Sequence, residues 1–359
     1  MEDTGKKRFA AAGIVAAGIV YFLACATPLP KELVLVPSWA RSLAQAPSAP
    51  GAREAAGALA PIPFRLGDRY GYFTQDGTVL FSAAQSYGVA LAEDAFAPYE
   101  RLSEGFSILS PEGQVQAKAA IVGYPFFAAG RRFVIAPDQA SVSELASSGQ
   151  ATWTYHFPSI VTTFDASPSV AAFGLVDGGI VGLDKAGKAV LDFAPGGSRI
   201  AGVYGVAISP DGQLVAAVTG LDKQRLVVME KRATAYRVAY HRYLSSDFRR
   251  VIYMGFTSDG RHLEYESPSG IGVYDRDTRQ ETIVPVPTGY KLGLTARAGR
   301  LLAILSGDGT ESRLVCAELP DRRVLDVAFQ AKQAFVDTRG DAIFLGADDI
   351  LERMDLRER

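Results

Sequence analysis

The sequence predicts an all-β protein made of repeated small sheets, and three observations lead to that prediction. Over residues 64–359, short apolar runs recur between glycine, aspartate and proline residues, which is typical of strands joined by tight turns. No helical period extends over any long stretch of this region. The chain also holds 36 glycines, 15 tyrosines and 19 phenylalanines, a composition that favours strands and turns.

One pattern, a strand followed by a turn and a second strand, recurs along the chain. Its clearest copy is GVAISPDGQLVAAV at 205–218, and others lie at 254–265, 293–304 and 334–344. The turn positions are 39 to 48 residues apart, at Gly130, Ser169, Gly212, Gly260, Gly299 and Gly340. A period near 40 with about four short strands per unit is typical of β-propeller blades. Such sheets cover one another's apolar faces around a ring.

Two of these segments resemble the repeats of known propeller families. Residues 208–212, ISPDG, look like the turn of WD40-like and TolB-type blades. Residues 182–193, GLDKAGKAVLDF, are similar to the repeat of quinoprotein propellers, and 148–155 fits that pattern with Trp153 at the aromatic position. The resemblance covers most of 118–359. It implies a bacterial extracytoplasmic propeller and says nothing about activity.

The repeats predict seven blades of four antiparallel strands each. Hairpins at 70–81 and 106–115 are expected to form the first blade together, with 87–104 as an insertion. Together with the six turn positions this gives seven units of about 42 residues, and six or eight units stay open as alternatives. The last unit is short of a strand. Ile62–Leu66 is expected to supply it and so cover an open sheet edge.

An apolar run at residues 9–26, FAAAGIVAAGIVYFLACA, predicts one N-terminal transmembrane or signal helix before the propeller. Its length as a helix, about 27 Å, is close to the roughly 30 Å of a bilayer's hydrocarbon core. Lys6, Lys7 and Arg8 precede it, so residues 1–8 are predicted to be a cytoplasmic basic region and the remainder to lie outside.

Three fates of this apolar run are compatible with the sequence. The run is retained as an anchor, cleaved as a signal after Ala26, or cleaved before a lipidated Cys25 at the end of a loose lipobox. All three place the protein at or beyond the outer side of the membrane. Residues 27–63 are predicted to be a Pro/Ala-rich linker, in which 32–37 is either a docking strand or a juxtamembrane segment, and 64–359 the propeller domain.

No set of residues in the sequence predicts catalysis, cofactor binding or a metal site. Lysine plus arginine total 37 and aspartate plus glutamate 39, which argues against a nucleic-acid partner. His156, His241 and His262 fall in different predicted blades, and metal-ligand spacings, nucleophile elbows and phosphate-binding loops are absent from the sequence. Enzymatic activity is therefore not favoured, although ligands that converge on the axis from different blades need no contiguous motif.

Basic and aromatic residues are concentrated between residues 225 and 250. One interpretation is a surface for an acidic partner or lipid headgroups; the other is a solvated outer strand with charges on alternating faces. The residues of this candidate interaction surface are Arg232, Tyr236, Arg237, Tyr240, Arg242 and Tyr243. The predicted function is a non-catalytic, membrane-tethered scaffold that binds another envelope or membrane protein. The alternative is an enzyme or sensor with a small molecule or metal in its axial channel.

Overall fold

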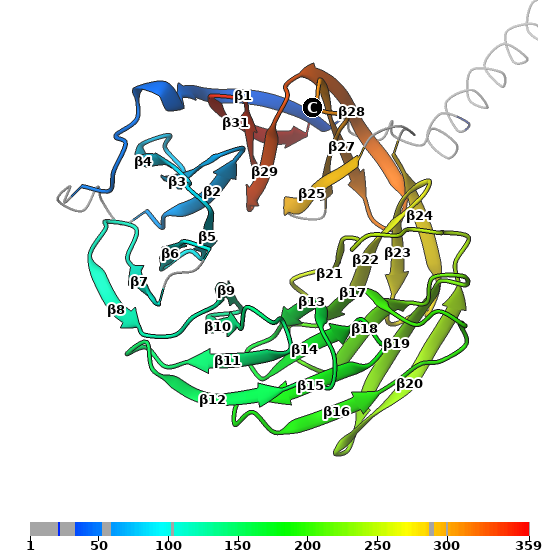
Figure 1. The fold of residues 1–359 in the computed structure, drawn as a ribbon. Helices are drawn as coiled ribbons and strands as arrows, with labels where there is room; N and C mark the ends of the chain where they lie inside the picture. The colour runs from blue at the N-terminus through cyan, green and yellow to red at the C-terminus, as the bar shows by residue number, and fades with distance from the viewer. Residues whose placement is uncertain are drawn as a thin grey trace, which may run out of the picture. The chain divides into compact units, whose positions relative to one another are not determined.

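The computed structural model describes residues 21, 33–51, 59–101, 104–286, 291–298 and 301–358, mainly as strands joined by turns and loops (Figure 1). The chain divides into two compact units, residues 1–34 with 357–359 and residues 35–356. The second unit contains a ring of small sheets, and the sheets follow one another around the ring in chain order (Figure 1).

Four sheets make up the first half of the ring, and consecutive strands pair within each. They are β2–β4 (Ile62–Leu66, Arg69–Phe73, Val79–Ala84), β5–β8 (Gly88–Leu91, Phe96–Tyr99, Phe106–Leu109, Val115–Ala119), β9–β12 (Tyr124–Ala128, Arg131–Ile135, Ser141–Leu145, Ala151–His156) and β13–β16 (Val161–Ala166, Val170–Leu175, Ile180–Asp184, Ala189–Phe193).

Four further sheets complete the ring. They are β17–β20 (Val203–Ile208, Leu214–Thr219, Arg225–Arg232, Ala235–Tyr243), β21–β24 (Met254–Phe256, His262–Ser267, Gly270–Asp275, Glu281–Pro285), β25–β28 (Lys291–Ala298, Leu301–Gly307, Glu311–Glu318, Arg322–Gln330) and β29–β31 (Ala334–Arg339, Ala342–Ala347, Ile350–Glu358) joined by β1 (Leu33–Ser42).

The described residues form eight sheets, so the prediction of seven blades is wrong. The error lies in residues 87–104, which were expected to be an insertion and instead supply β5 and β6. The two hairpins assigned to one blade therefore belong to two sheets. β5 and β6 are only four residues long, and the Ala92 amide closes their turn by donating to the Ala95 carbonyl at 2.8 Å. This turn contains no glycine, so the repeat pattern does not mark it. The all-β class and the propeller architecture are confirmed.

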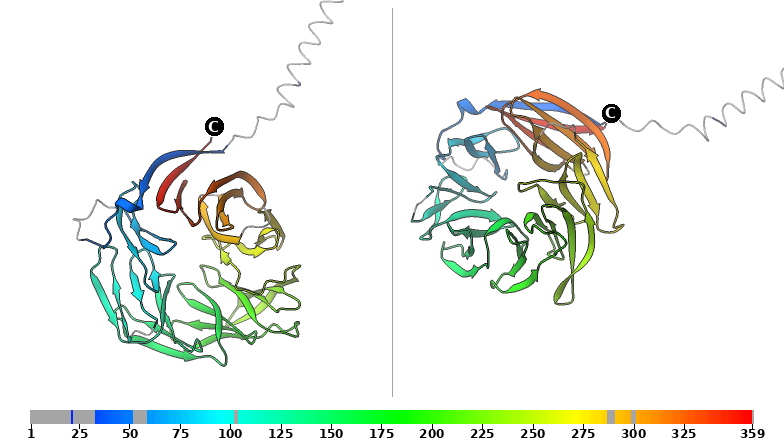
Figure 2. Two further views of the ribbon diagram at one scale, coloured as in Figure 1. Left: turned by 45° about the horizontal axis from the view of Figure 1, so that its top comes forward. Right: turned by 45° about the vertical axis from the view of Figure 1, so that its right-hand side comes forward.

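The last sheet is completed by the other end of the chain. Its strand order is β1-β31-β30-β29, which makes β1 the outer strand (Figure 2). The Ile62–Leu66 segment that was expected in this place is instead the first strand of the next sheet. Trp39 on β1 packs on Phe344 and Phe73, with ring centroids 6.1 and 6.3 Å apart, and so joins the last sheet to the first.

Apolar side chains fill the space between neighbouring sheets. Phe133 and Phe173, for example, meet between β9–β12 and β13–β16, and Tyr72 and Phe96 lie in one cluster between β2–β4 and β5–β8. β18 is buried along its whole length because it is a central strand covered on both faces. Each fully buried large side chain of this kind contributes about 1.5–3 kcal/mol. Stacking around the ring is therefore the main source of stability.

The predicted helix at 9–26, with Cys25 and the cleavage position at Ala26, lies outside the described residues except for Tyr21. Apart from that residue, the described ranges contain one helical element, the three-residue 3-10 helix η1 (Leu43–Gln45). In the described parts of the chain, no helix has the length and apolar character needed to cross a membrane. The described architecture is thus eight sheets without the helix that the prediction placed before them.

Part of the predicted linker has defined structure. β1 starts at Leu33 and is followed by η1, whose Leu43 is fully buried. The Pro47 carbonyl then accepts a 2.8 Å hydrogen bond from the Ser82 amide on β4. The docking-strand interpretation of the 32–37 segment, which stood open in the sequence, therefore agrees with the position of β1.

Candidate functional site

The six residues of the candidate interaction surface lie on β20 or at the end of β19. β20 is the outermost strand of its sheet, and β19 is its only strand neighbour in the described structure. We call the exposed side chains of this strand, with its open edge, the β20 surface. The structure therefore places five of the predicted residues on one outer strand and Arg232 at the end of its neighbour.

Two tyrosines on opposite faces of β20 fix the strand to the rest of the ring, since Tyr236 packs beside Met229 and Tyr240 beside Val228. The Tyr236 hydroxyl donates to the Gly212 carbonyl at 2.6 Å. The Tyr240 hydroxyl donates to Glu281 Oε2 at 3.0 Å, and Arg242 Nη1 lies 3.1 Å from the same oxygen. The Glu281 side chain is only 5% exposed, so this carboxylate joins β20 firmly to the next sheet. Burial, together with the hydrogen bond to Glu281, raises the pKa of Tyr240 to about 12.

Other side chains of β20, on both of its faces, are exposed to solvent. Arg237 and His241 are exposed, Val238 is 42% exposed and Tyr243 is 50% exposed. Within the described part of the chain, no carboxylate forms an ion pair with Arg237, whereas Arg232 is paired with Glu230 at 3.2 Å. The predicted set therefore divides into anchoring residues and exposed ones. Sequence reasoning missed Val238 because it looked only for charged and aromatic side chains.

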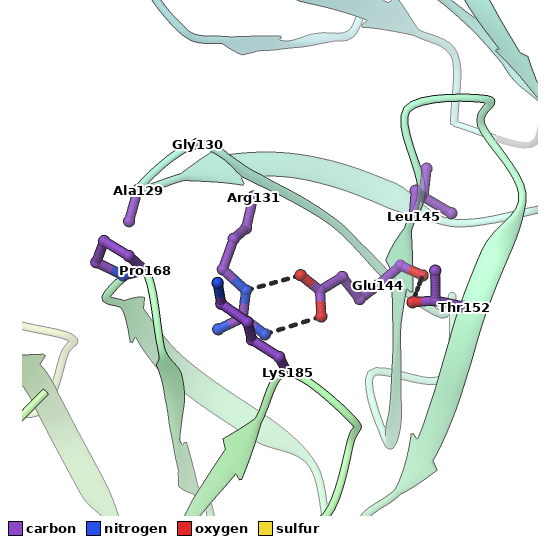
Figure 3. A pocket seen from close by; sticks show the side chains of 8 residues that line it. All are labelled: Ala129, Gly130, Arg131, Glu144, Leu145, Thr152, Pro168 and Lys185. Atoms are coloured by element: carbon purple, nitrogen blue, oxygen red, sulfur yellow. Dashed lines mark hydrogen bonds and ion pairs between the residues drawn. The ribbon is translucent and has the colours of Figure 1, made fainter.

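A pocket of about 340 Å³ lies between the β9–β12 and β13–β16 sheets, lined by strand residues of the first sheet and by turns of both (Figure 3). We call it the inter-sheet pocket. Its walls are mostly small or apolar, and its polar groups come from both sheets. The residues that line it are Ala129, Gly130, Arg131, Glu144, Leu145, Thr152, Pro168 and Lys185.

A buried ion pair forms the polar wall of the inter-sheet pocket. Arg131 Nε lies 2.7 Å from Glu144 Oε1, and Arg131 Nη2 lies 2.8 Å from Glu144 Oε2 (Figure 3). The two side chains are 7% and 13% exposed. Arg131 also lies over the Phe133 ring, 4.8 Å from its centroid. The bidentate geometry satisfies both carboxylate oxygens, as a buried charge requires.

Lys185 projects from the turn between β15 and β16, and this turn is held from two sides. Asp184 Oδ1 accepts hydrogen bonds from the Ala186 and Lys188 amides, both at 2.9 Å. Trp153 on β12 donates its indole N–H to the Lys185 carbonyl at 3.1 Å. The turn residue Gly187 has φ +75°, and a Cβ there would lie 2.6 Å from the Trp153 ring. The backbone that carries Lys185 is therefore fixed in position.

The structure gathers the histidines and the domain cysteine into no common site. Across the residues it describes, there is no group of three or more His, Cys, Asp or Glu side chains placed to hold a metal ion. His156 and His241 are exposed on outer strands, and His262 Nε2 lies 3.5 Å from Asp275. Cys316 is fully buried on β27, where burial raises the pKa of its thiol to about 12 and keeps it protonated.

Comparison with known proteins agrees with the observed ring. A protein-family profile described as "beta-propeller protein" matches residues 1–359, the whole length of the chain. The chain belongs to this family of beta-propeller proteins. An uncharacterized protein of Treponema pallidum (strain Nichols) is 29% identical over 344 residues, which cover 94% of this propeller chain and 91% of the relative.

Solved propeller structures share the fold at low sequence identity. BamB from Moraxella catarrhalis gives a TM-score of 0.60 at 14% identity and covers 90% of this chain and 100% of its own. The computationally designed Ika8 protein gives 0.59 at 12% identity, with 83% and 96% covered. A complex of KlAtg21 with the coiled-coil of AgAtg16 gives 0.56 at 12% identity, with 76% and 100% covered. At these identities the likeness concerns the fold alone.

Proposed function

We propose that this propeller is a non-catalytic scaffold that binds a protein partner through the β20 surface. The observation that carries the proposal is a rigid outer strand whose second edge is open. Tyr236 and Tyr240 fix β20 from its two faces, while Arg237, Val238 and His241 are exposed. A strand that is already fixed loses little conformational freedom when a partner binds, which favours affinity.

The chemistry of the β20 surface favours an extended acidic segment as the partner. The open edge of a strand offers backbone N–H and C=O groups that an added strand can pair with. Arg237 and His241 supply positive or protonatable groups beside that edge, and exposed Tyr243 and Val238 supply apolar contact. Tyrosine and arginine are enriched among the residues that dominate binding energy at protein interfaces.

The proposed location is the cell envelope, on the outer side of the membrane. It is supported by the sequence of residues 1–26, in which three basic residues precede an uncharged apolar run. A partner in this compartment would be another envelope or membrane protein. Propellers of similar fold include one solved as a complex with a coiled coil, which agrees with protein binding as a use of this architecture.

A photo-crosslinking amino acid at Val238 tests the proposal, with the same substitution at Val327 as its control. The two valines are 42% and 44% exposed, and both lie on nine-residue outermost strands, β20 and β28. In cells that make the full chain, we expect a discrete crosslinked protein with Val238 and none with Val327. Equal crosslinking from both positions, or none from Val238, would contradict the proposal.

Charge reversal then tests whether the partner is acidic. Arg237→Glu should weaken the Val238 crosslink at least tenfold, because a like charge would face the acidic segment. Lys332→Glu makes the same change in net charge at an exposed position in the loop between β28 and β29 and should leave the crosslink unchanged. An unchanged crosslink in Arg237→Glu would exclude an acidic partner at this strand.

A further inference from the structure

We infer that the inter-sheet pocket binds a carboxylate group carried on a short apolar arm. The inference does not involve the β20 surface, so it stands or falls separately from the proposed function. It rests on three features of the pocket: an uncompensated positive charge, a carboxylate that cannot neutralise that charge, and apolar walls around a volume suited to a small ligand.

The charged residues that line the pocket leave one positive charge in excess. Arg131 and Lys185 are cationic and Glu144 is anionic. Glu144 uses both of its oxygens on Arg131, at 2.7 and 2.8 Å, so the pair is neutral as a unit. Lys185 is an exposed residue, and in the described structure its ammonium forms no ion pair with a carboxylate. A ligand with one negative charge would therefore balance the pocket.

The Arg131–Glu144 ion pair also keeps Lys185 available to bind an anion. If Glu144 could turn away from Arg131, it would pair with Lys185 and close the site to an anion. Such a turn would leave the guanidinium of Arg131, which is only 7% exposed, without its carboxylate partner, and this is strongly unfavourable for a buried charge. Arg131 therefore acts as a positioning residue, because it holds Glu144 away from the ligand's charge.

The rest of the pocket favours an apolar arm of limited size. Ala129, Leu145 and Pro168 form its other walls, and the Thr152 hydroxyl is already used by the Glu144 carbonyl at 3.1 Å. A volume of about 340 Å³ is at the lower end of the range for small-molecule sites. The contacts made by Trp153 and Asp184 hold the backbone of Lys185 in place, so binding requires little new ordering of the chain.

Fluorine NMR on the full chain tests this site with 4-fluorobenzoate and its neutral isostere 4-fluorobenzamide as probes. We expect the benzoate signal to broaden and shift on addition of protein, and the benzamide signal to respond at least five times more weakly. High salt should weaken the benzoate response. Equal responses to both probes, or none to the benzoate at millimolar concentration, would overturn the inference.

Variants locate the binding in the pocket. Lys185→Gln should weaken benzoate binding about fivefold to tenfold, because it removes the charge that faces the ligand. Lys188→Gln is the matched control, since Lys188 is an exposed lysine in the same turn that does not line the pocket. An equal loss in both variants would show that the turn's overall charge, and not this pocket, attracts the probe.

A third variant produces a change in the opposite direction and so does not depend on loss of binding. Glu144→Gln keeps the shape and one acceptor for Arg131 but removes the negative charge. Benzoate binding should become several times tighter in this variant while its thermal unfolding remains cooperative. Unchanged or weaker binding in a folded Glu144→Gln protein would overturn the inference.

The carboxylate has two sources that the same assay separates. Acetyl-Gly-Gly-(4-fluorophenylalanine) with a free C-terminus presents it at the end of a chain, and the C-terminal amide is its control. If the acid binds more tightly than 4-fluorobenzoate, the natural ligand is a chain terminus. If the acid is excluded while 4-fluorobenzoate binds, the natural ligand is a small free acid.

Discussion

Two tryptophans make the same contact in two parts of the ring, and the surroundings of the two contacts differ. Trp153 donates its indole N–H to the Lys185 carbonyl at 3.1 Å, and Trp39 donates to the Gln75 carbonyl at 3.0 Å. Each indole ring lies against a left-handed glycine that follows two residues later in the turn. An outer strand of one sheet is thereby attached to a turn of the next.

The difference lies in the strand beside each tryptophan. Next to Trp39, Arg353 pairs in register with Phe344, and its Nη1 donates to the Gln75 carbonyl at 2.9 Å. At the corresponding position next to Trp153, Glu144 pairs in register with Phe133 and turns back to Arg131. At the Trp39 contact, Arg353 thus bonds to the next sheet. At the Trp153 contact, Glu144 bonds to Arg131 in its own sheet and lines the inter-sheet pocket. The two contacts share the tryptophan and its turn and differ in the side chain on the neighbouring strand.

The largest expected difference between the two contacts is in the loss of unfolding free energy when Glu144 or Arg353 is truncated to alanine. Glu144→Ala leaves a buried guanidinium without its partner and should lower the free energy of unfolding by about 3–5 kcal/mol. Arg353→Ala removes a side chain that is 26% exposed and should cost about 1 kcal/mol. Chemical denaturation of both variants measures this. An equal loss of unfolding free energy in the two variants would contradict the proposed difference between the two contacts.

The next comparison is between two buried aspartates on the inner strands of their sheets, Asp165 on β13 and Asp337 on β29. Burial raises the pKa of Asp165 to about 6, against hydrogen bonds from the Ile208 and Ala166 amides that lower it. Burial also raises the pKa of Asp337, but Arg339 opposes the shift from 3.0 Å away. A folded-state pKa above the unfolded value of 3.8 means that the folded protein binds the proton more tightly.

The contribution of Asp165 to stability should therefore be fully present below pH 4 and be lost as the pH rises to about 6. The loss amounts to about 3 kcal/mol, because one pKa unit is about 1.4 kcal/mol. The Asp165→Asn side chain cannot ionise. The difference in unfolding free energy between this variant and the wild type, measured at pH 4, 5, 6 and 7, should therefore change by about 3 kcal/mol over this pH range. Asp337→Asn should show a smaller divergence in the same series. A constant offset between Asp165→Asn and wild type would show that the carboxyl does not titrate there.

The smallest expected difference comes from the tryptophans themselves. Trp153→Phe removes the indole donor to the Lys185 carbonyl and should cost about 1 kcal/mol. Trp39→Phe should cost less, because Arg353 still donates to the Gln75 carbonyl. Thermal unfolding measures both variants in parallel. A larger loss in Trp39→Phe would mean that joining the first and last sheets depends on that indole more than on the arginine.

The sequence predicted the repeat unit well because tight turns leave a mark in one position. Gly130, Gly212, Gly260 and Gly340 all adopt left-handed φ between +59° and +71°, as a turn between the first two strands of a unit requires. The eighth sheet was missed because the turn from Ala92 to Ala95 does without glycine. Local composition marks a turn only when its backbone needs an unusual residue.

The two sites differ in how far the sequence predicted them. The β20 surface was found because its residues are adjacent in sequence. The inter-sheet pocket was not found, because Arg131 and Glu144 meet only through the register of β10 and β11, and Lys185 comes from the next sheet. Trp153 was recognised as an aromatic position of a repeat, but its equivalent, Trp39, lies in a segment that was assigned to a linker.

The position of β1 also sets the order of events during synthesis. The ribosome makes this strand first, yet its place beside β31 exists only after almost the whole chain has emerged. Until then the edge that β1 offers to β31 stays unpaired, although Trp39 can already contact Phe73 and Gln75 of the first sheet. Pairing of β1 with β31 thus needs strands from both ends of the ring, and a chain that lacks either one loses part of the last sheet.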